Sequence, residues 1–175
     1  MDTKCLYAEL PGDHFELLPP VLREFHRRGG NAAGTFDVER GATTLVTRAF
    51  MDSMGIPSAA SKVDVRLSID RSAQKETWNR WFGARLMRTR QWTSSGLLME
   101  QLGLARMEFR ITPVERGFVF ECVECRAIGL CVPRILKPRV RASIIVKQDG
   151  WGVDVQIDDS QGTMVCRYGG KMRLA

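Results

Sequence analysis

Beyond residue 57, apolar and polar residues alternate along the chain with a period of two. Between Val63 and Ile69 every second residue is aliphatic and the others are charged or carry a hydroxyl, which predicts a strand with one wet face. The same period predicts further strands at about 75–82, 85–92, 96–102, 104–112, 117–126, 139–147, 151–157 and 163–168. Most joints between them are short and hold turn residues, the strongest signal being Asp149-Gly150. Links this short cannot make parallel crossovers, so we expect an antiparallel meander.

The first third of the chain follows the helical period instead. One short helix is predicted from about Leu17 to Gly29, because prolines open it, basic residues close it and a glycine follows. A second helix begins with Thr43 or Thr44 as its cap and ends near Met54, before a glycine and a proline. The residues expected to face the core are Leu18, Val21, Leu22, Phe25, Leu45, Val46, Ala49 and Phe50.

Three connecting segments complete the pattern. Residues 29–34 are rich in glycine, alanine and asparagine and are predicted to form a loop. Phe36 and Val38 alternate with acidic residues, which predicts a short strand that ends at Gly41. Between Ala127 and Pro138, two prolines and several aliphatic residues predict a short turn of helix over the mouth of the sheet.

These elements predict a mainly β fold of the α+β type, with about 8 to 10 antiparallel strands and two short N-terminal helices. A twisted sheet of this size curls, so we expect a meandering barrel or half-barrel. A lipocalin-like can and a helix-grip cup are the nearest architectures, and the lack of a helical pattern after Met164 favours the can. No repeat or linker divides the sequence, so residues 1–175 are expected to form a single domain.

The charge of the chain bears on its partners and its location. The net charge is +6, and arginine supplies 20 of the 26 basic residues. A basic surface attracts phosphates, but acidic residues on neighbouring strands dilute this one, so nucleic acid is disfavoured as a partner. No run of about 18 apolar residues exists, and charged residues interrupt the first ten positions. We therefore expect no membrane span and a cytoplasmic location.

No cofactor or metal motif is visible. Glycine-rich nucleotide-binding patterns are absent, so no cofactor is expected. Cys122 and Cys125 are spaced as half of a zinc site, but the chain offers no second pair to complete it. On a regular strand, residues three apart point to opposite faces, so the two thiols are not expected to converge. We predict reduced thiols and no metal site.

The most informative residues are polar side chains that share the parity of an apolar strand face. Burying a charge without a partner costs several kcal/mol as an order of magnitude, so each needs a partner or a ligand. Together with a histidine at the end of the first helix, they form the candidate ligand-binding site: Arg40, Arg80, Arg90, Glu100, Glu124, Tyr168 and His26.

Three interpretations of these residues stay open. Arginines that project into a barrel would bind the carboxylate or phosphate of a small hydrophobic, anionic molecule. They would otherwise pair with Glu100 and Glu124 as internal ion pairs. If the strand parity is inverted, they face water.

Two classes of function are consistent with this pattern. The first is a small-ligand-binding or accessory domain that holds a hydrophobic, anionic molecule. The second is a barrel-type or cup-type enzyme, an isomerase or hydrolase, with His26, Glu39 or Tyr168 as acid or base. The enzyme requires such groups to reach one concave site, so we prefer the first class.

Five short segments, spread over nearly the whole chain, follow one another in a characteristic order: Leu18–His26, Val38–Gly41, Trp78–Gly83, Leu130–Arg134 and Val165–Gly170. Together they resemble the bacterial family known as domain of unknown function 4166. Members of that family occur alone or fused to saccharopine-dehydrogenase-like reductase modules. The resemblance therefore implies an accessory or substrate-handling role beside a reductase partner, and it brings no established catalytic residues.

Overall fold

The computed structural model describes residues 6–9, 15–16, 18–28, 30–42, 44–72 and 74–175. Its helices are α1 (Leu6–Glu9), α2 (Pro20–Arg28) and α3 (Leu45–Ser53). The strands are β1 (Ala32–Arg40), β2 (Ala60–Ser72), β3 (Lys75–Phe82), β4 (Arg85–Ser94), β5 (Leu97–Leu102), β6 (Ala105–Val114), β7 (Gly117–Ala127), β8 (Leu130–Cys131), β9 (Arg139–Lys147), β10 (Gly150–Asp158) and β11 (Met164–Leu174).

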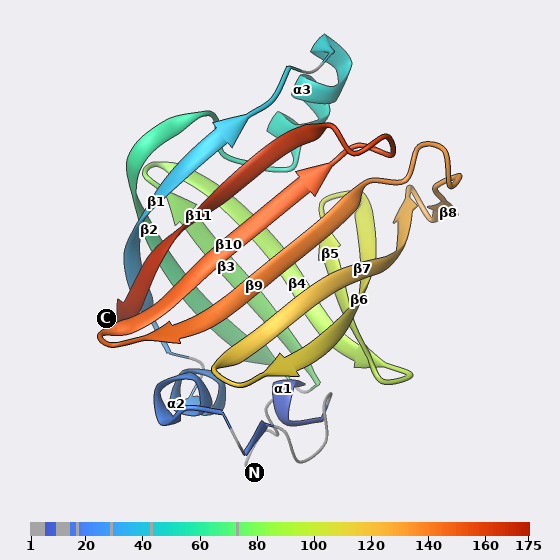
Figure 1. Ribbon diagram of the computed structural model, residues 1–175. Helices are drawn as coiled ribbons and strands as arrows, with labels where there is room; N and C mark the ends of the chain where they lie inside the picture. The colour runs from blue at the N-terminus through green and yellow to red at the C-terminus, as the bar shows by residue number, and fades with distance from the viewer. Residues whose placement is uncertain (1–5, 10–14, 17, 29, 43, 73) are drawn as a thin grey trace.

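All strands except the two-residue β8 form one closed antiparallel barrel (Figure 1). Strands β1 to β7 pair in sequence order, β7 pairs with β9, and β11 pairs back with β1. The pairing of β6 with β7 joins the two halves of the sheet, and β8 only extends the end of β7. The predicted antiparallel meander is confirmed, and the closure selects a barrel over a half-barrel.

The two ends of the barrel differ (Figure 1). Helices α1 and α2 lie at the end drawn at the bottom, and Leu18, Leu22 and Phe25 are buried there as predicted. Helix α3 and the connection from β7 to β9 lie at the opposite end. We call these the closed end and the open end. Among the described residues, no helix is long and apolar enough to cross a bilayer.

The first strand is longer than predicted. β1 begins at Ala32, so the predicted loop over residues 29–34 is wrong for its second half. Packing requires a glycine at position 34, because a Cβ there would lie 2.0 Å from the carbonyl oxygen of Lys171 on β11. This glycine permits a close approach of two strands and does not mark a turn.

The connection from β7 to β9 contains no helix. Ile128 and Gly129 form a turn with positive φ at both residues, and β8 follows. A second turn is closed by the Leu136 amide, which donates to the Pro133 carbonyl at 2.8 Å. The predicted helical turn is wrong, because this single turn does not continue into a helix before Pro138.

Helix α3 lies where the sequence predicts it, but it presents other residues to the core. The Thr44 hydroxyl accepts a backbone amide bond at 3.1 Å and caps the helix as expected. Leu45 and Phe50, predicted to face the core, are 80% and 43% exposed, and Met51 is buried instead. The side chain of Val46 lies outside the described residues. A short helix at a barrel end has only a narrow face against the sheet, so an apolar stripe along it is left largely open.

Candidate ligand-binding cavity

The barrel encloses a cavity of about 510 Å³. Its wall is mainly apolar and is built by side chains from most strands, among them Leu98, Phe109 and Phe120. Pockets for small molecules measure roughly 300–1,000 Å³ and are lined mainly by apolar groups. The interior is therefore large enough for a small apolar molecule.

Among the polar side chains that line the cavity, four lie together on neighbouring strands: Arg80 on β3, Thr89 and Gln91 on β4, and Glu100 on β5. We call them the polar cluster. Arg80 donates to the Thr89 hydroxyl at 2.8 Å and, through both terminal nitrogens, to Glu100 Oε1 at 3.4 Å. Gln91 donates to the same oxygen at 3.1 Å. The guanidinium also lies over the Trp78 ring at 4.9 Å. For Arg80, the structure therefore shows an internal ion pair whose two charges balance.

Tyr168 on β11 adds an unengaged hydroxyl to the cavity wall. The residue is 9% exposed, and its ring packs edge-on against Phe82 at 5.5 Å. Burial raises the pKa of the phenol well above its usual range, so the group is a neutral hydrogen-bond donor. Among the residues that the structure describes, neither this hydroxyl nor Glu100 Oε2 has a hydrogen-bond partner. At this part of the wall, Tyr168 thus presents a free donor and Glu100 a free acceptor.

His26 borders the cavity at the closed end, inside a shell of aromatic rings. The Tyr7 ring lies 4.0 Å from it, and the rings of Phe25 and Trp78 lie at 5.3 and 5.9 Å. Burial lowers the pKa of the imidazole to about 3, with a further contribution from Arg71. The buried Nδ1 has no hydrogen-bond partner among the described residues. His26 is consequently neutral near pH 7 and part of an apolar shell.

A buried carboxylate that sequence reasoning missed ties the closed end to the barrel. Glu76 on β3 accepts from Arg71 Nε and from the Trp78 indole, each at 3.0 Å, and from the backbone amide of Leu6. Arg71 also donates to the carbonyl of Arg27 in α2. These bonds hold α2 and α1, a helix that the sequence pattern did not predict. Glu76 shares the inward parity of Trp78, which is the signal that could have identified it.

Arg40 lies at the open end and does not line the cavity. From the end of β1 it donates to the carbonyls of Ile56 and Pro57 at 2.7 and 2.8 Å, and it pairs with Asp52 at 3.1 Å. Asp52 also accepts from Arg85 on β4. Arg40 therefore attaches the end of α3 to the barrel.

Arg90 is on the outer surface of the barrel. The inward positions of β4 belong to Thr89 and Gln91, so Arg90 between them is exposed. The parity inferred from the sequence is inverted on this strand, because Leu86 and Trp92 are apolar residues on its outer face. β4 carries large apolar groups on both faces, and alternation alone does not say which face is inside.

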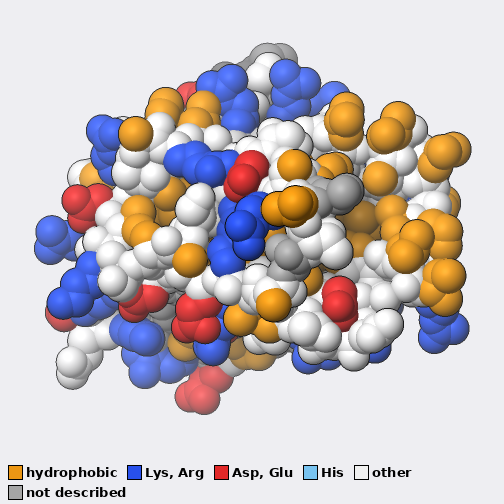
Figure 2. All heavy atoms as spheres, turned by 90° about the horizontal axis from the view of Figure 1, so that it is seen from above, with side chains coloured by type: hydrophobic (Ala, Val, Ile, Leu, Met, Phe, Trp, Pro, Cys, Tyr) orange, Lys and Arg blue, Asp and Glu red, His pale blue; other side chains and the backbone are white. Residues whose placement is uncertain are grey.

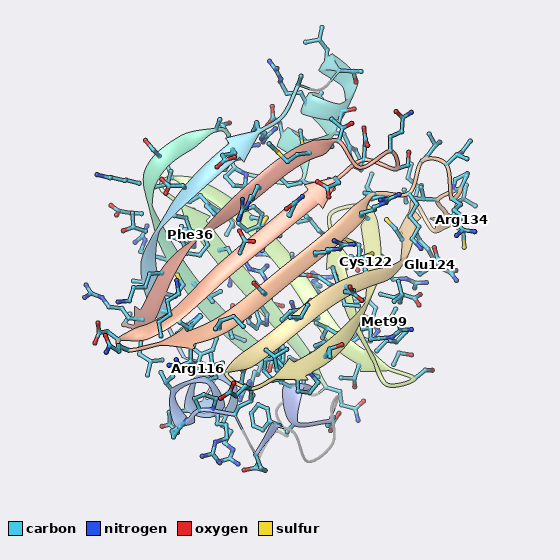
Figure 3. The ribbon with its side chains drawn as sticks, in the orientation of Figure 1. Phe36, Met99, Arg116, Cys122, Glu124 and Arg134 are labelled. Atoms are coloured by element: carbon cyan, nitrogen blue, oxygen red, sulfur yellow. The ribbon has the colours of Figure 1, made fainter. Side chains whose placement is uncertain are left out.

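A β-bulge in β7 keeps Glu124 out of the cavity. The register with β6 shifts between Glu108 and Phe109 and leaves Val123 without a partner. The extra residue reverses the parity beyond it, so Cys125 lines the cavity where plain alternation predicts Glu124. Glu124, labelled in Figure 3, instead accepts from the Cys125 amide at 2.9 Å.

Of the three groups considered as acid or base for an enzyme, two border the cavity and the third lies outside the barrel. Glu39 is exposed on the outside of β1, in a polar groove that also contains Asp154 and Arg167. Tyr168 and His26 border the cavity, the first from β11 and the second from α2. The geometry brings Arg80, Glu100, Tyr168 and His26 to one cavity and places the other candidate residues elsewhere.

The cysteines of the described chain are free thiols: Cys122, Cys125, Cys131 and Cys166. Burial raises the pKa of the Cys122 thiol to about 12, which keeps it protonated. Within the described ranges, no group of three or more histidine, cysteine, aspartate or glutamate residues could hold a metal ion.

Fold and cavity define the class of protein, which is an antiparallel β-barrel around an apolar cavity. The chain belongs to the family described as domain of unknown function (DUF4166), whose model matches residues 18–172. This confirms the resemblance seen in the sequence. The solved structure of a protein of unknown function from the DUF3598 family, from Nostoc punctiforme, is similar in fold, with a TM-score of 0.52 and 9% identity. The match covers 83% of this chain and 47% of that one, so the chain spans about half of that protein. No curated protein matches the chain.

Proposed function

We propose that the protein binds a small hydrophobic molecule with one polar end inside the barrel. The observation that carries this proposal is the 510 Å³ apolar cavity whose polar cluster and Tyr168 leave a donor and an acceptor unengaged. Burial of the apolar part would supply most of the binding free energy, at about 25 cal/mol per Å². The free hydroxyl and the free carboxylate oxygen would fix the orientation of the polar end.

The charge balance of the polar cluster indicates which polar end fits. A ligand carboxylate would have to displace Glu100 from Arg80, which would leave a second carboxylate in an apolar wall. A hydroxyl, carbonyl or amide can instead bond to Tyr168 or Glu100 with the ion pair intact. We therefore propose an uncharged polar end in preference to the anionic ligand expected from the arginine pattern.

Two variants on one strand test whether the cavity binds ligand. Met87→Trp places an indole inside the cavity, whereas Leu86→Trp places the same side chain outside the barrel. We expect the parent and Leu86→Trp to bind the neutral fluorophore N-phenyl-1-naphthylamine and to release it when dodecanol is added. Met87→Trp should bind roughly tenfold more weakly or worse, because its indole occupies the space. Equal binding by both folded variants, checked by circular dichroism, would refute the cavity as the site.

A second comparison tests the polar end. Dodecanol should bind the parent more tightly than dodecanoate, which has the same chain. Glu100→Gln removes the competing carboxylate, so it should improve the affinity for dodecanoate by roughly tenfold while changing that for dodecanol little. If dodecanoate is the tighter ligand of the parent, the ligand is anionic and Arg80 is its counter-ion.

An accessory role beside a reductase belongs to the same proposal. The family resemblance supports it, and a molecule held in the barrel would be the substrate or product of that partner. A reductase that acts faster on the ligand delivered by this protein than on the free ligand would support the role. Equal rates would refute the accessory role without affecting the proposal of ligand binding.

A further inference from the structure

The open end carries most of the large apolar side chains that the barrel leaves exposed. Two of them lie on α3, one lies on the turn between β5 and β6, and four lie on the connection from β7 to β9. Figure 2 views this end and shows hydrophobic side chains gathered at its right side, with basic and acidic side chains intermixed over the rest of the face. We call these residues the apolar rim: Leu45, Phe50, Leu104, Ile128, Leu130, Ile135 and Leu136.

The parts of the rim are in contact with one another. A Cβ on Gly103 would lie 3.6 Å from the Met54 side chain, so the β5–β6 turn packs against the end of α3. The Ile128 amide donates to the Leu104 carbonyl at 3.0 Å, which joins the same turn to the β7–β9 connection. The rim is therefore one structure built from three segments.

The rim is also continuous with the cavity. Phe50 and Leu136 line the cavity although they are 43% and 67% exposed. An apolar path thus leads from the outside of the open end into the barrel. At the closed end the cavity is bordered by residues that are almost fully buried, among them Leu22 and Tyr7.

Basic side chains accompany the rim. Residues 125–139 contain four basic residues and no acidic one. Arg134, labelled in Figure 3 on the connection that projects from the open end, is exposed, as is Arg48 on α3. An apolar edge mixed with exposed arginine is typical of segments that lie in the headgroup region of a lipid bilayer.

Two further arginines lie opposite each other beside the rim. Arg106 and Arg126 are direct partners in the β6–β7 register, two residues from Leu104 and from Ile128 respectively, and the next pair on the same outer face is Glu108 with Glu124. The Nε atom of each is buried with no hydrogen-bond partner in the described part of the chain, and neither arginine forms an ion pair there. Like charges directly opposite each other are destabilising. A bound phosphate group would remove this repulsion and accept the free N–H groups.

We propose that the open end docks on the surface of an anionic phospholipid bilayer. The apolar rim lies among the upper parts of the acyl chains, and Arg106, Arg126 and Arg134 contact lipid phosphates. Loop tips that project around an opening suit a planar, deformable surface. Each arginine near anionic lipid raises the affinity by roughly fivefold. The inference goes beyond ligand binding, because docking needs no molecule in the cavity.

Co-sedimentation with vesicles tests the apolar part of the proposal. The parent protein should co-sediment with vesicles of phosphatidylcholine and phosphatidylglycerol. Leu130→Gln/Ile135→Gln should reduce the partition by roughly tenfold or more, because two buried aliphatic side chains are lost. The matched control Val114→Gln/Leu174→Gln alters exposed apolar residues away from the rim and should bind as the parent does. All four positions are exposed, so the fold should persist, and circular dichroism checks this.

The charge of the lipid is the second arm of the test. Arg106→Gln/Arg126→Gln should lower binding to phosphatidylglycerol vesicles by roughly tenfold, toward the level seen with phosphatidylcholine alone. Millimolar inorganic phosphate should not release the parent protein, since a free anion does not replace the apolar contacts. The cavity variant Met87→Trp should bind vesicles as the parent does, which separates this test from the test of ligand binding.

Three results would overturn the proposal. The parent protein could fail to sediment with anionic vesicles, or the rim and control variants could bind equally well. The parent could also form a dimer in gel filtration that Leu130→Gln/Ile135→Gln separates into monomers, in which case the rim binds a second copy of the chain.

Discussion

The polar residues in the wall of the barrel are stabilised in two ways, by hydrogen bonds within an ion pair or by loss of charge. Arg80 and Glu100 neutralise each other, and Gln91 and Thr89 complete their hydrogen bonds. His26 remains uncharged within its aromatic shell. The protonation state of such groups depends on burial, so their effect on stability depends on pH.

The clearest residue-scale prediction concerns acid and His26. Its pKa is about 3 in the folded chain and near 6.5 when exposed, so the unfolded chain binds the extra proton between these values. The contribution of His26 to the free energy of unfolding is therefore fully present above about pH 6.5, and it is lost as the pH is lowered toward 3. We expect a loss of about 3 kcal/mol between pH 7 and pH 4, measured by urea unfolding.

His26→Leu is the matched variant for this prediction. It keeps an apolar side chain in the shell and removes the titrating group, so its stability should depend much less on pH over the same interval. Burial raises the pKa of Glu76, so the contribution of this carboxyl to the stability of the fold decreases as the pH rises. Its pH dependence is therefore opposite to that of His26. Equal slopes against pH in the parent and the variant would contradict the assignment.

Site residues were predictable where the strand neighbours on both sides are buried. Arg80 lies between two large inward residues, and Tyr168 follows a buried cysteine at the same parity. The prediction that Arg90 faces the cavity was wrong because apolar residues occupy both faces of β4. Glu124 failed because an inserted residue, Val123, reverses the alternation, and nothing in the local composition marks that insertion.

At the scale of elements, alternation predicted the strands well because one face of each strand is wet. The helix predictions depended on caps and stops, and these were present for α2 and α3 and too weak for the four-residue α1. Glycine misled the prediction for the first strand. In β1 it serves the close contact of two strands, and such contacts between distant segments are not visible in a local pattern.

The same close contact leads to a prediction for β11. A Cβ on Gly170 would lie 2.0 Å from the Thr35 carbonyl oxygen and 2.7 Å from the Phe36 ring. Gly170→Ala must therefore displace a strand and should lower the free energy of unfolding by about 2 kcal/mol, measured with urea. Gly30→Ala is the control, because a Cβ there meets nothing within 4 Å. Because Gly→Ala lowers the entropy of the unfolded chain, the control should keep or gain stability. A loss of equal size in both variants would show that the strand contact does not set the cost.

For the whole molecule, the bonds of Glu76 join the closed end to the barrel wall. Glu76→Leu leaves the Arg71 guanidinium and the Trp78 indole without their acceptor, and it frees the amide of Leu6. We expect a loss of about 3 kcal/mol in stability, and faster proteolysis within α1 and α2 than within the strands. Glu39→Leu on the outer surface should change stability by less than about 0.5 kcal/mol. If the two variants have the same free energy of unfolding, the bonds of Glu76 do not attach the closed end to the barrel.

The difference between the two ends also limits how the interior can be used. Among the described residues, those that border the cavity at the closed end are almost fully buried, so the open end is the route into the cavity that these residues show. Under the proposed ligand binding, a partner that delivers the molecule and a partner that receives it would both bind at this end. Binding of one partner would then exclude the other, so loading and unloading would be separate states of the protein.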